Sequence, residues 1–142
     1  MQLNAEGFLV GVQLAAGLMR SRGGRIVGLS SLGSRYYIPN YAALGAAKAA
    51  IENLARYLAV ELAPDNINVN VVCGGFIDTE SIKVIPDYDA ATDMILARTP
   101  AARLGQPEDL AGIVAFLCSD ESDWIRGQTI VADGGISLSH AL

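Results

Sequence analysis

The sequence predicts an α/β fold in which three parallel strands are flanked by helices. Three runs rich in branched apolar residues are typical of strands, at 25–31, 66–73 and 128–132. Between them lie longer segments whose apolar residues recur at helical spacing. Strands that alternate with helices in this way form parallel sheets joined by right-handed crossovers.

The beginning of the chain predicts a helix that ends at a glycine pair. Gly23 and Gly24 separate this helix from the first strand, RIVGLSS. Glycine commonly ends a helix because it adopts the left-handed backbone conformation without strain. The apolar residues that recur at helical spacing are Phe8, Leu9, Val12, Leu14, Ala15, Leu18 and Met19.

The first strand is followed by a predicted loop and then by a long helix. The loop SLGSRYYIPN covers residues 31–40, and the helix contains YAALGAAKAAIENLARYLAVEL. Pro64 marks the end of this helix, because proline cannot continue the helical hydrogen bonds. The second strand, at 66–73, alternates branched apolar residues with asparagine.

Two further helices and the last strand complete the expected order. A short helix is expected around 90–98, within a variable stretch that ends near Pro100. Pro107, followed by Glu108 and Asp109, suits the first turn of a helix that continues through LAGIVAFLC. The last strand ends at the Asp-Gly-Gly sequence of residues 133–135.

The composition favours one compact domain in a reducing compartment. The chain has 142 residues, of which 51% are hydrophobic and 18% are charged. Cys73 and Cys118 lie in apolar contexts without CxxC spacing, so we expect two free buried thiols and no metal site. Free thiols favour the cytoplasm. His140 stands alone and is interpreted as a tail residue.

The charge pattern argues against nucleic acid and membrane as partners. The net charge is −5, and Arg20, Arg22 and Arg25 form only a short basic cluster at a helix end. The first 19 residues lack a cationic start and an apolar run long enough to span a bilayer. We therefore expect no role in binding nucleic acid or membrane.

Tyr41 and Lys48 are the most informative pair in the sequence. They stand seven residues apart in the long helix. Seven steps of 100° amount to about 700°, so both side chains lie on one face, about 10 Å apart along the axis. This arrangement suits a tyrosine acid and a lysine that positions a cofactor.

Residues 25–140 resemble the catalytic half of a short-chain dehydrogenase/reductase. The spacing of Tyr41 and Lys48 is similar to that of the enoyl-acyl-carrier-protein reductases, whereas most members place tyrosine four residues before the lysine, where this chain has Leu44. Hydride adds to an enoyl thioester at the β-carbon, away from the carbonyl. A tyrosine moved back by three residues, about 4.5 Å of helix, suits that greater separation.

The resemblance implies further catalytic residues. Ser31 stands seventeen residues before Lys48, as the catalytic serine of the family does, and SSLGS is similar to the type III enoyl reductases. Asn4 resembles the family asparagine that holds a water near the lysine. Loop capping by Ser31 and helix capping by Asn4 remain open as simpler interpretations. Tyr36 and Tyr37 are interpreted as packing residues rather than as walls of an acyl channel.

A cofactor-binding loop is implied after the second strand. The sequence Gly-Gly at 74–75 replaces the usual Pro-Gly of the family, again as in type III enzymes. Gly75 lets the backbone approach the nicotinamide, Ile77 supplies amide groups, and Thr79 reaches a phosphate. The resemblance also implies that Lys48 binds the nicotinamide ribose. Residues 80–100 are expected to form a substrate lid.

The expected fold is therefore a truncated Rossmann-like domain with three parallel strands and flanking helices. The phosphate-binding glycine turn of the family follows its first strand, and this sequence contains no such turn. Residues 1–142 are interpreted as the C-terminal portion of one domain whose N-terminal dinucleotide-binding half is absent. We expect such a chain to bind coenzyme weakly and to leave the strand GRIVGLSS as an unprotected edge.

The implied activity of the full-length protein is reduction of trans-2-enoyl thioesters on acyl carrier protein in fatty-acid synthesis. The implied cofactor is NADPH, with NADH as the alternative, and the residues that choose between them are not in this sequence. Reduction of 3-oxoacyl or other carbonyl substrates is one alternative, and an inactive fragment or interaction partner is another. The segments IRGQT and DGG resemble the final strand of the family, which contributes to subunit contacts and implies a homo-oligomer.

Overall fold

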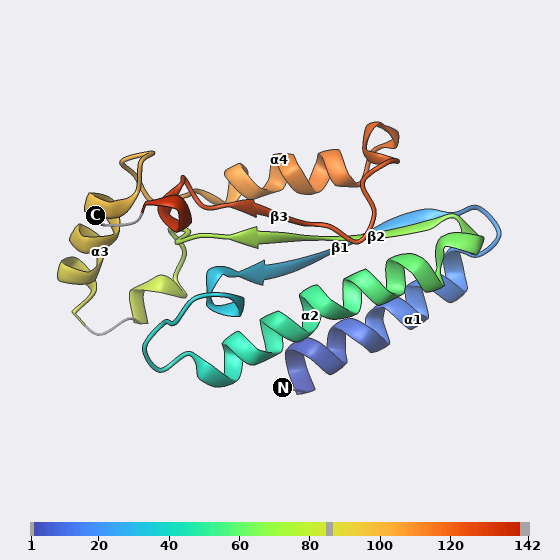
Figure 1. Ribbon diagram of the computed structural model, residues 1–142, viewed down its shortest axis with the longest axis horizontal. Helices are drawn as coiled ribbons and strands as arrows, with labels where there is room; N and C mark the ends of the chain where they lie inside the picture. The colour runs from blue at the N-terminus through green and yellow to red at the C-terminus, as the bar shows by residue number, and fades with distance from the viewer. Residues whose placement is uncertain (1, 85–86, 140–142) are drawn as a thin grey trace.

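The computed structural model describes residues 2–84 and 87–139, and three strands alternate with helices along them (Figure 1). The strands are parallel and lie in the order β1-β2-β3. The helices α1 and α2 lie side by side on one side of the sheet, and α4 lies on the other. The main elements are η1 (Gln2–Glu6), α1 (Gly7–Met19), β1 (Gly24–Ser31), η2 (Leu32–Ser34), α2 (Ala42–Glu61), η3 (Ala63–Asp65), β2 (Ile67–Gly74), η4 (Ile82–Val84), α3 (Tyr88–Arg98), α4 (Pro107–Leu117) and β3 (Thr129–Ala132).

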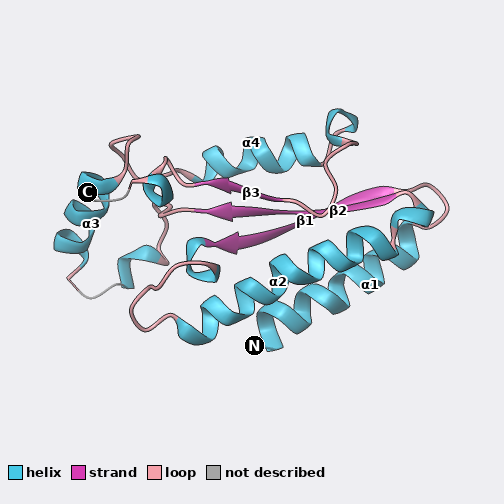
Figure 2. Cartoon of the chain, in the orientation of Figure 1, coloured by secondary structure: helices cyan, strands magenta, loops and turns pink. Residues whose placement is uncertain are grey.

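The predicted α/β fold with three parallel strands is confirmed. Each observed strand begins or ends within one residue of its predicted limits. The helix α2 begins at Ala42, so Tyr41 is its N-terminal cap and not a residue of its first turn. Figure 2 shows the three strands pointing the same way, with α3 beyond their C-terminal ends.

The main hydrophobic core lies between the sheet and the pair α1 and α2. Alternate residues of β2 face these helices because successive side chains of a strand point to opposite faces. Small residues at the contact allow the helices to approach the sheet closely. The buried members of this core are Val12, Ala16, Ile51, Ala55, Leu58, Ala59, Ile67, Val69 and Val71.

The other face of β2 buries two asparagines. Asn68 and Asn70 are 2% and 1% exposed. Each donates through Nδ2 to the Ile125 carbonyl oxygen at 2.7 Å, and Asn70 Oδ1 accepts from the Gln128 amide at 2.9 Å. Burial of a polar group is costly unless it is hydrogen-bonded. The polar positions of this strand therefore hold the loop that leads into β3.

Local signals in the sequence set the ends of the elements. Gly23 adopts a φ of 72°, and its amide donates to the Met19 carbonyl at 2.8 Å, which ends α1 as predicted. The helix α4 begins at Pro107 with a capping box, in which Asp109 accepts from the Gln106 amide at 2.6 Å. Pro64 lies in η3, beyond the end of α2.

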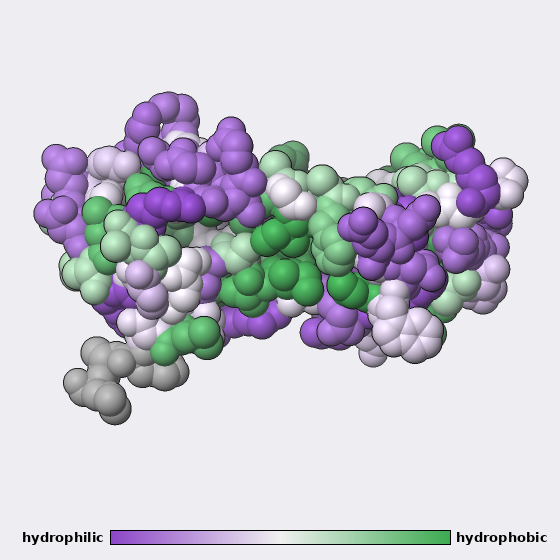
Figure 3. Space-filling model, turned by 90° about the horizontal axis from the view of Figure 1, so that it is seen from above, coloured by the Kyte–Doolittle hydropathy of each residue, from purple (hydrophilic) through white to green (hydrophobic). Residues whose placement is uncertain are grey.

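Apolar side chains remain exposed on β1 and α4. Leu29 is 52% exposed, and within the described residues β1 pairs along one edge only, with β2. Figure 3 shows apolar residues gathered in the middle of the face seen from above, between more polar ends. None of the described helices is both long enough and apolar enough to cross a membrane. His140 lies outside the described residues.

The two cysteines differ in exposure. Both are free, but Cys73 is buried in β2 and Cys118 is exposed at the C-terminal cap of α4. The prediction that both thiols are buried is thus wrong for Cys118, which lies at the end of the helix and not on its buried side. Burial, together with the nearby charge of Glu52, raises the pKa of Cys73 to about 11.

We expect one fast-reacting thiol in the folded chain. Since the thiolate is the reactive species, Cys73 should resist a disulfide reagent at pH 8, whereas Cys118 should react within minutes. Absorbance titration before and after unfolding in guanidinium measures both groups. Replacement of Cys118 by Ser should remove the fast phase, and Cys73→Ser should remove only the phase seen after unfolding. A fast phase that survives Cys118→Ser would contradict this assignment.

Candidate active site

The hydroxyls of Ser31 and Tyr41 meet at the C-terminal end of β1. Ser31 is the last residue of this strand, and Tyr41 caps α2. Ser31 Oγ lies 3.0 Å from Tyr41 Oη, a hydrogen bond in which either group can donate. The structure therefore brings these two predicted residues together, although they are ten positions apart in the sequence.

Lys48 reaches the same end of β1 from the next turns of α2. Its ammonium group donates to the Leu29 carbonyl oxygen at 3.0 Å, two residues before Ser31. Partial burial lowers the pKa of Lys48, because removal from water disfavours the charged form. Lys48 of α2 thus places its ammonium group against β1, the strand that ends at Ser31.

Two glycines seat the ring of Tyr41. A Cβ atom on Gly33 would overlap the Tyr41 ring, and one on Gly45 would overlap the Gly33 carbonyl oxygen. The Tyr41 carbonyl accepts from the Gly45 amide at 2.7 Å in the first turn of α2. The absence of side chains at both glycines therefore allows η2, α2 and the ring to pack together.

Asn4 lies apart from this pair. It is half-buried in η1, a π-helical segment that packs against α2 and precedes α1. The N-terminal cap of α1 is Glu6, so the interpretation of Asn4 as the cap is wrong. The hydrogen bonds of the described side chains include none between Asn4 and Ser31, Tyr41 or Lys48. The catalytic role of Asn4 remains a prediction.

An apolar cleft of about 760 Å³ opens beside the two hydroxyls. This volume suits a small-molecule ligand, since such sites are mostly apolar and contain a few polar groups. Three segments form it: the end of β1, the approach to α2, and the stretch after β2. The lining residues are Ser31, Leu32, Ile38, Pro39, Asn40, Tyr41, Leu44, Gly75, Phe76, Ile77, Thr79, Ser81 and Ile82.

The predicted cofactor loop lines this cleft through Gly75, Ile77 and Thr79. Gly75 donates to the Ala132 carbonyl at 3.0 Å, and a Cβ atom there would lie 2.7 Å from the Asp133 Cα. Asp78 donates to the Gly105 carbonyl at 2.8 Å. These bonds fasten the loop to two segments behind it, and the Ile77 amide donates none of them.

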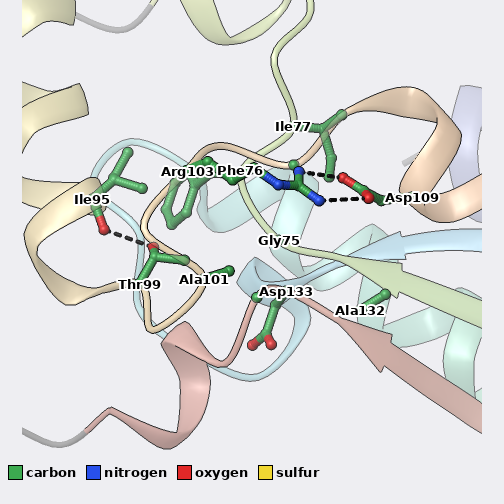
Figure 4. A pocket seen from close by; sticks show the side chains of 12 residues that line it. Gly75, Phe76, Ile77, Ile95, Thr99, Ala101, Arg103, Asp109, Ala132 and Asp133 are labelled. Carbon is green, nitrogen blue, oxygen red and sulfur yellow. Dashed lines mark hydrogen bonds and ion pairs between the residues drawn. The ribbon is translucent and has the colours of Figure 1, made fainter.

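A smaller cavity of about 180 Å³ lies on the other side of the same loop (Figure 4). Arg103 donates to both carboxylate oxygens of Asp109 there, at 2.6 and 2.8 Å. This bond and the Gln106 amide hold the pKa of Asp109 well below its usual range. Asp133 accepts from the amides of Gly135 and Ser137. The charged groups Arg103, Asp109 and Asp133 at this cavity therefore already have hydrogen-bond partners within the chain.

Sequence reasoning missed two groups of residues at this site. Several cleft walls, among them Leu32, Ile38 and Ile82, are ordinary apolar residues whose proximity depends on the fold. Glu52 beneath the site carried a visible signal, because it interrupts the apolar stripe of α2 between Ile51 and Ala55. The aromatic residues Tyr36 and Tyr37 line shallow pockets outside the main cleft.

Comparison with known proteins places these features in a family. The family model described as Enoyl-(Acyl carrier protein) reductase matches residues 1–137. The chain is 47% identical over 138 residues to 1-cyclohexenylcarbonyl-CoA reductase of Streptomyces collinus, covering 96% of this chain and 49% of that protein. The chain belongs to the short-chain dehydrogenase/reductase family.

Other members of the short-chain dehydrogenase/reductase family are named for different activities. Enoyl-[acyl-carrier-protein] reductase [NADH] FabI of Bacillus subtilis is 36% identical over 149 residues, covering 98% of this chain and 58% of that protein. The crystal structure of a gluconate 5-dehydrogenase from Burkholderia cenocepacia in complex with NADP and tartrate superimposes with a TM-score of 0.93 and 33% identity. That match covers 99% of this chain and 55% of the dehydrogenase, so the chain spans about half the length of its relatives.

We expect Gly45→Ala to destabilise the chain. Alanine ordinarily stabilises a helix interior by about 1 kcal/mol relative to glycine, but here the added methyl group overlaps the Gly33 carbonyl. The midpoint of thermal unfolding should therefore fall. Gly112→Ala in α4 is the matched control, because its Cβ meets nothing within 4 Å and should raise the midpoint. A rise for both variants would contradict the close packing beneath Tyr41.

Proposed function

We propose that this chain carries the catalytic centre of a nicotinamide-dependent reductase that acts on trans-2-enoyl thioesters. The observation that carries the proposal is the hydrogen-bonded pair Ser31 and Tyr41 at the wall of a mostly apolar cleft. Membership of an oxidoreductase family whose matching model is named for enoyl reduction supports it. We infer further that the chain is the C-terminal part of a longer protein, the complete enzyme.

The residues present fit a nicotinamide coenzyme. A reduced coenzyme supplies hydride when it is bound, and NADPH is proposed, with NADH as the alternative. Lys48 would hold the ribose, and the loop of Gly75, Ile77 and Thr79 would hold the carboxamide and a phosphate. Support comes from the donors present: Thr79 and Ile77 line the cleft, and the Lys48 ammonium group lies on the Leu29 carbonyl oxygen, two residues before Ser31.

Tyr41 would act on the thioester carbonyl oxygen. When the β-carbon of the enoyl group is reduced, negative charge develops on this oxygen as an enolate, which the phenol stabilises by hydrogen bonding. The Ser31 hydroxyl orients the phenol at 3.0 Å. The positive charge of Lys48 favours transfer of the phenolic proton, because a nearby cation stabilises the phenolate. The resulting enol then tautomerises: the α-carbon gains a proton from water while the oxygen loses its own, so one hydride and one proton are added in all.

The position of Leu44 favours enoyl over carbonyl reduction. Leu44 lines the cleft three residues after Tyr41, at the place where most family members carry the tyrosine. An apolar side chain there cannot donate a proton to a ketone oxygen. Reduction of 3-oxoacyl or other carbonyl substrates remains the second candidate, because a gluconate 5-dehydrogenase shares the fold closely.

The proposed carrier of the acyl group is acyl carrier protein, in cytoplasmic fatty-acid synthesis. The Streptomyces collinus relative is named for reduction of a coenzyme A thioester, so coenzyme A is the alternative carrier. Exposed apolar residues on α1 and α2, among them Leu14, Leu18 and Val60, support a homo-oligomer. A function of a different class is also proposed, in which this chain is an inactive fragment or an interaction partner. The match to only about half the length of its relatives supports this alternative.

The complete enzyme should reduce crotonyl thioesters faster than acetoacetyl thioesters. Steady-state assays with each acyl group on acyl carrier protein and on coenzyme A, with NADPH and NADH, measure this preference. A chimaera in which residues 1–137 replace the matching segment of the Streptomyces collinus reductase provides an independent version of the same assay. Equal or faster ketone reduction by the complete enzyme would sink the enoyl assignment.

Replacement of the phenol should lower turnover without weakening coenzyme binding. We expect Tyr41→Phe to reduce kcat by about 10² to 10⁴-fold, the usual contribution of a general acid. Lys48→Ala should reduce kcat and also weaken coenzyme binding measured by titration calorimetry. Tyr57→Phe is the matched control, because Tyr57 is 64% exposed on the same helix. Full activity of Tyr41→Phe would show that another group is the acid.

A further inference from the structure

Glu52 is a buried carboxylate that the proposed chemistry does not use. It lies on α2, one turn after Lys48, and is 4% exposed. A buried charge is costly unless charged and hydrogen-bonding partners compensate it. Glu52 lies in the apolar stripe of the helix, next to Ile51 and Ala55, which cannot form hydrogen bonds with its carboxylate.

Four hydrogen bonds from three residues satisfy the carboxylate. Ser30 Oγ donates to Oε1 at 2.7 Å, and Ser34 Oγ donates to the same oxygen at 2.5 Å. Arg35 donates to Oε2 through Nε at 3.1 Å and through a terminal nitrogen at 3.0 Å. Burial acts to raise the pKa of Glu52, but the bonds from Ser34, Ser30 and Arg35 outweigh it and lower that pKa. The group therefore stays ionised and accepts from every partner.

The three partners bracket the residues that form the catalytic corner. Ser30 precedes Ser31, whereas Ser34 and Arg35 end the turn η2 that follows it. Between these two attachment points lies Gly33, which packs against the Tyr41 ring. One carboxylate thus fastens the segment 30–35 on both sides of Ser31 to the helix that Tyr41 caps.

We propose that Glu52 is a positioning residue, which holds Ser31 within hydrogen-bond distance of Tyr41 by fastening the segment 30–35 to α2. This inference rests on the proposed function, because it assigns Glu52 an effect on turnover that acts through Ser31. The Glu52 carboxylate is bonded to residues on both sides of Ser31. These bonds restrict the direction of the Ser31 hydroxyl and the distance between the turn η2 and α2. Displacement of a catalytic group by about 1 Å can cost about 10²-fold in rate.

Glu52→Gln tests the proposal with little change in shape. All four bonds to the carboxylate come from donors, so an amide nitrogen in place of one oxygen faces donor groups and loses the charge that pairs with Arg35. We expect kcat of the complete enzyme to fall at least tenfold with crotonyl thioester, while the coenzyme dissociation constant changes less than twofold. Glu61→Gln at the exposed end of α2 is the matched control and should leave kcat unchanged.

A double-mutant cycle with Ser31→Ala separates positioning from general loss of structure. If Glu52 acts through Ser31, Glu52→Gln should reduce kcat less than twofold when Ser31 is already alanine, because residues that act as a unit are not additive. The same tenfold loss on both backgrounds would overturn the positioning role. An unchanged kcat for Glu52→Gln alone would overturn it equally.

The single variant Ser31→Ala distinguishes this inference from the proposed function. If Ser31→Ala retains full kcat, the catalytic assignment of the serine fails, and the positioning role fails with it. If Ser31→Ala loses activity but the cycle is additive, only the role of Glu52 is overturned.

Ser34→Ala provides a second route if Glu52→Gln does not fold. This change removes one donor and leaves the ion pair of Glu52 with Arg35 intact. The expected kcat falls about threefold, and the loss should again vanish on the Ser31→Ala background. Turnover equal to that of the unsubstituted enzyme, or an additive loss, would contradict the proposal.

Discussion

The site depends on the parallel register of β1 against β2. Eight residue pairs hold this register, from Gly24 opposite Ile67 to Ser31 opposite Gly74. The carboxyl ends of parallel strands meet at one edge of a sheet, so the register places Ser31 beside the start of the 75–79 loop. A shift of one residue would turn Ser31 to the opposite face and separate it from Tyr41.

Buried polar groups fix the orientation of the loops that adjoin the core, which apolar packing alone does not specify. The core between the sheet and α1 and α2 consists of branched and small side chains that give burial without direction. Asn68 and Asn70 orient the loop before β3, and Glu52 orients the turn after β1, each through several bonds. The buried polar side chains therefore lie next to the two loops whose conformation they hold, the one before β3 and the one after β1.

One edge of the sheet, along β1, has no strand neighbour among the described residues, and the chain spans about half the length of its relatives. Within the described residues β1 has one strand neighbour, and Leu29 of that strand is largely exposed. An unpaired strand edge readily pairs with another strand. The hydrogen bonds between Ser31 and Tyr41 and between Lys48 and Leu29 nevertheless form within this chain.

The sequence by itself determined the order of the strands and main helices and the seven-residue spacing between Tyr41, which caps α2, and Lys48 within that helix. These features are local, because apolar periodicity, glycine and proline act over a few residues. It also placed Ser31 and the Gly75 loop at strand ends. Tertiary structure alone decided which donors surround Glu52, that Cys118 is exposed, and that Ile38 and Ile82 share a cleft wall. Burial and long-range contact depend on which elements pack together, and no local pattern encodes that.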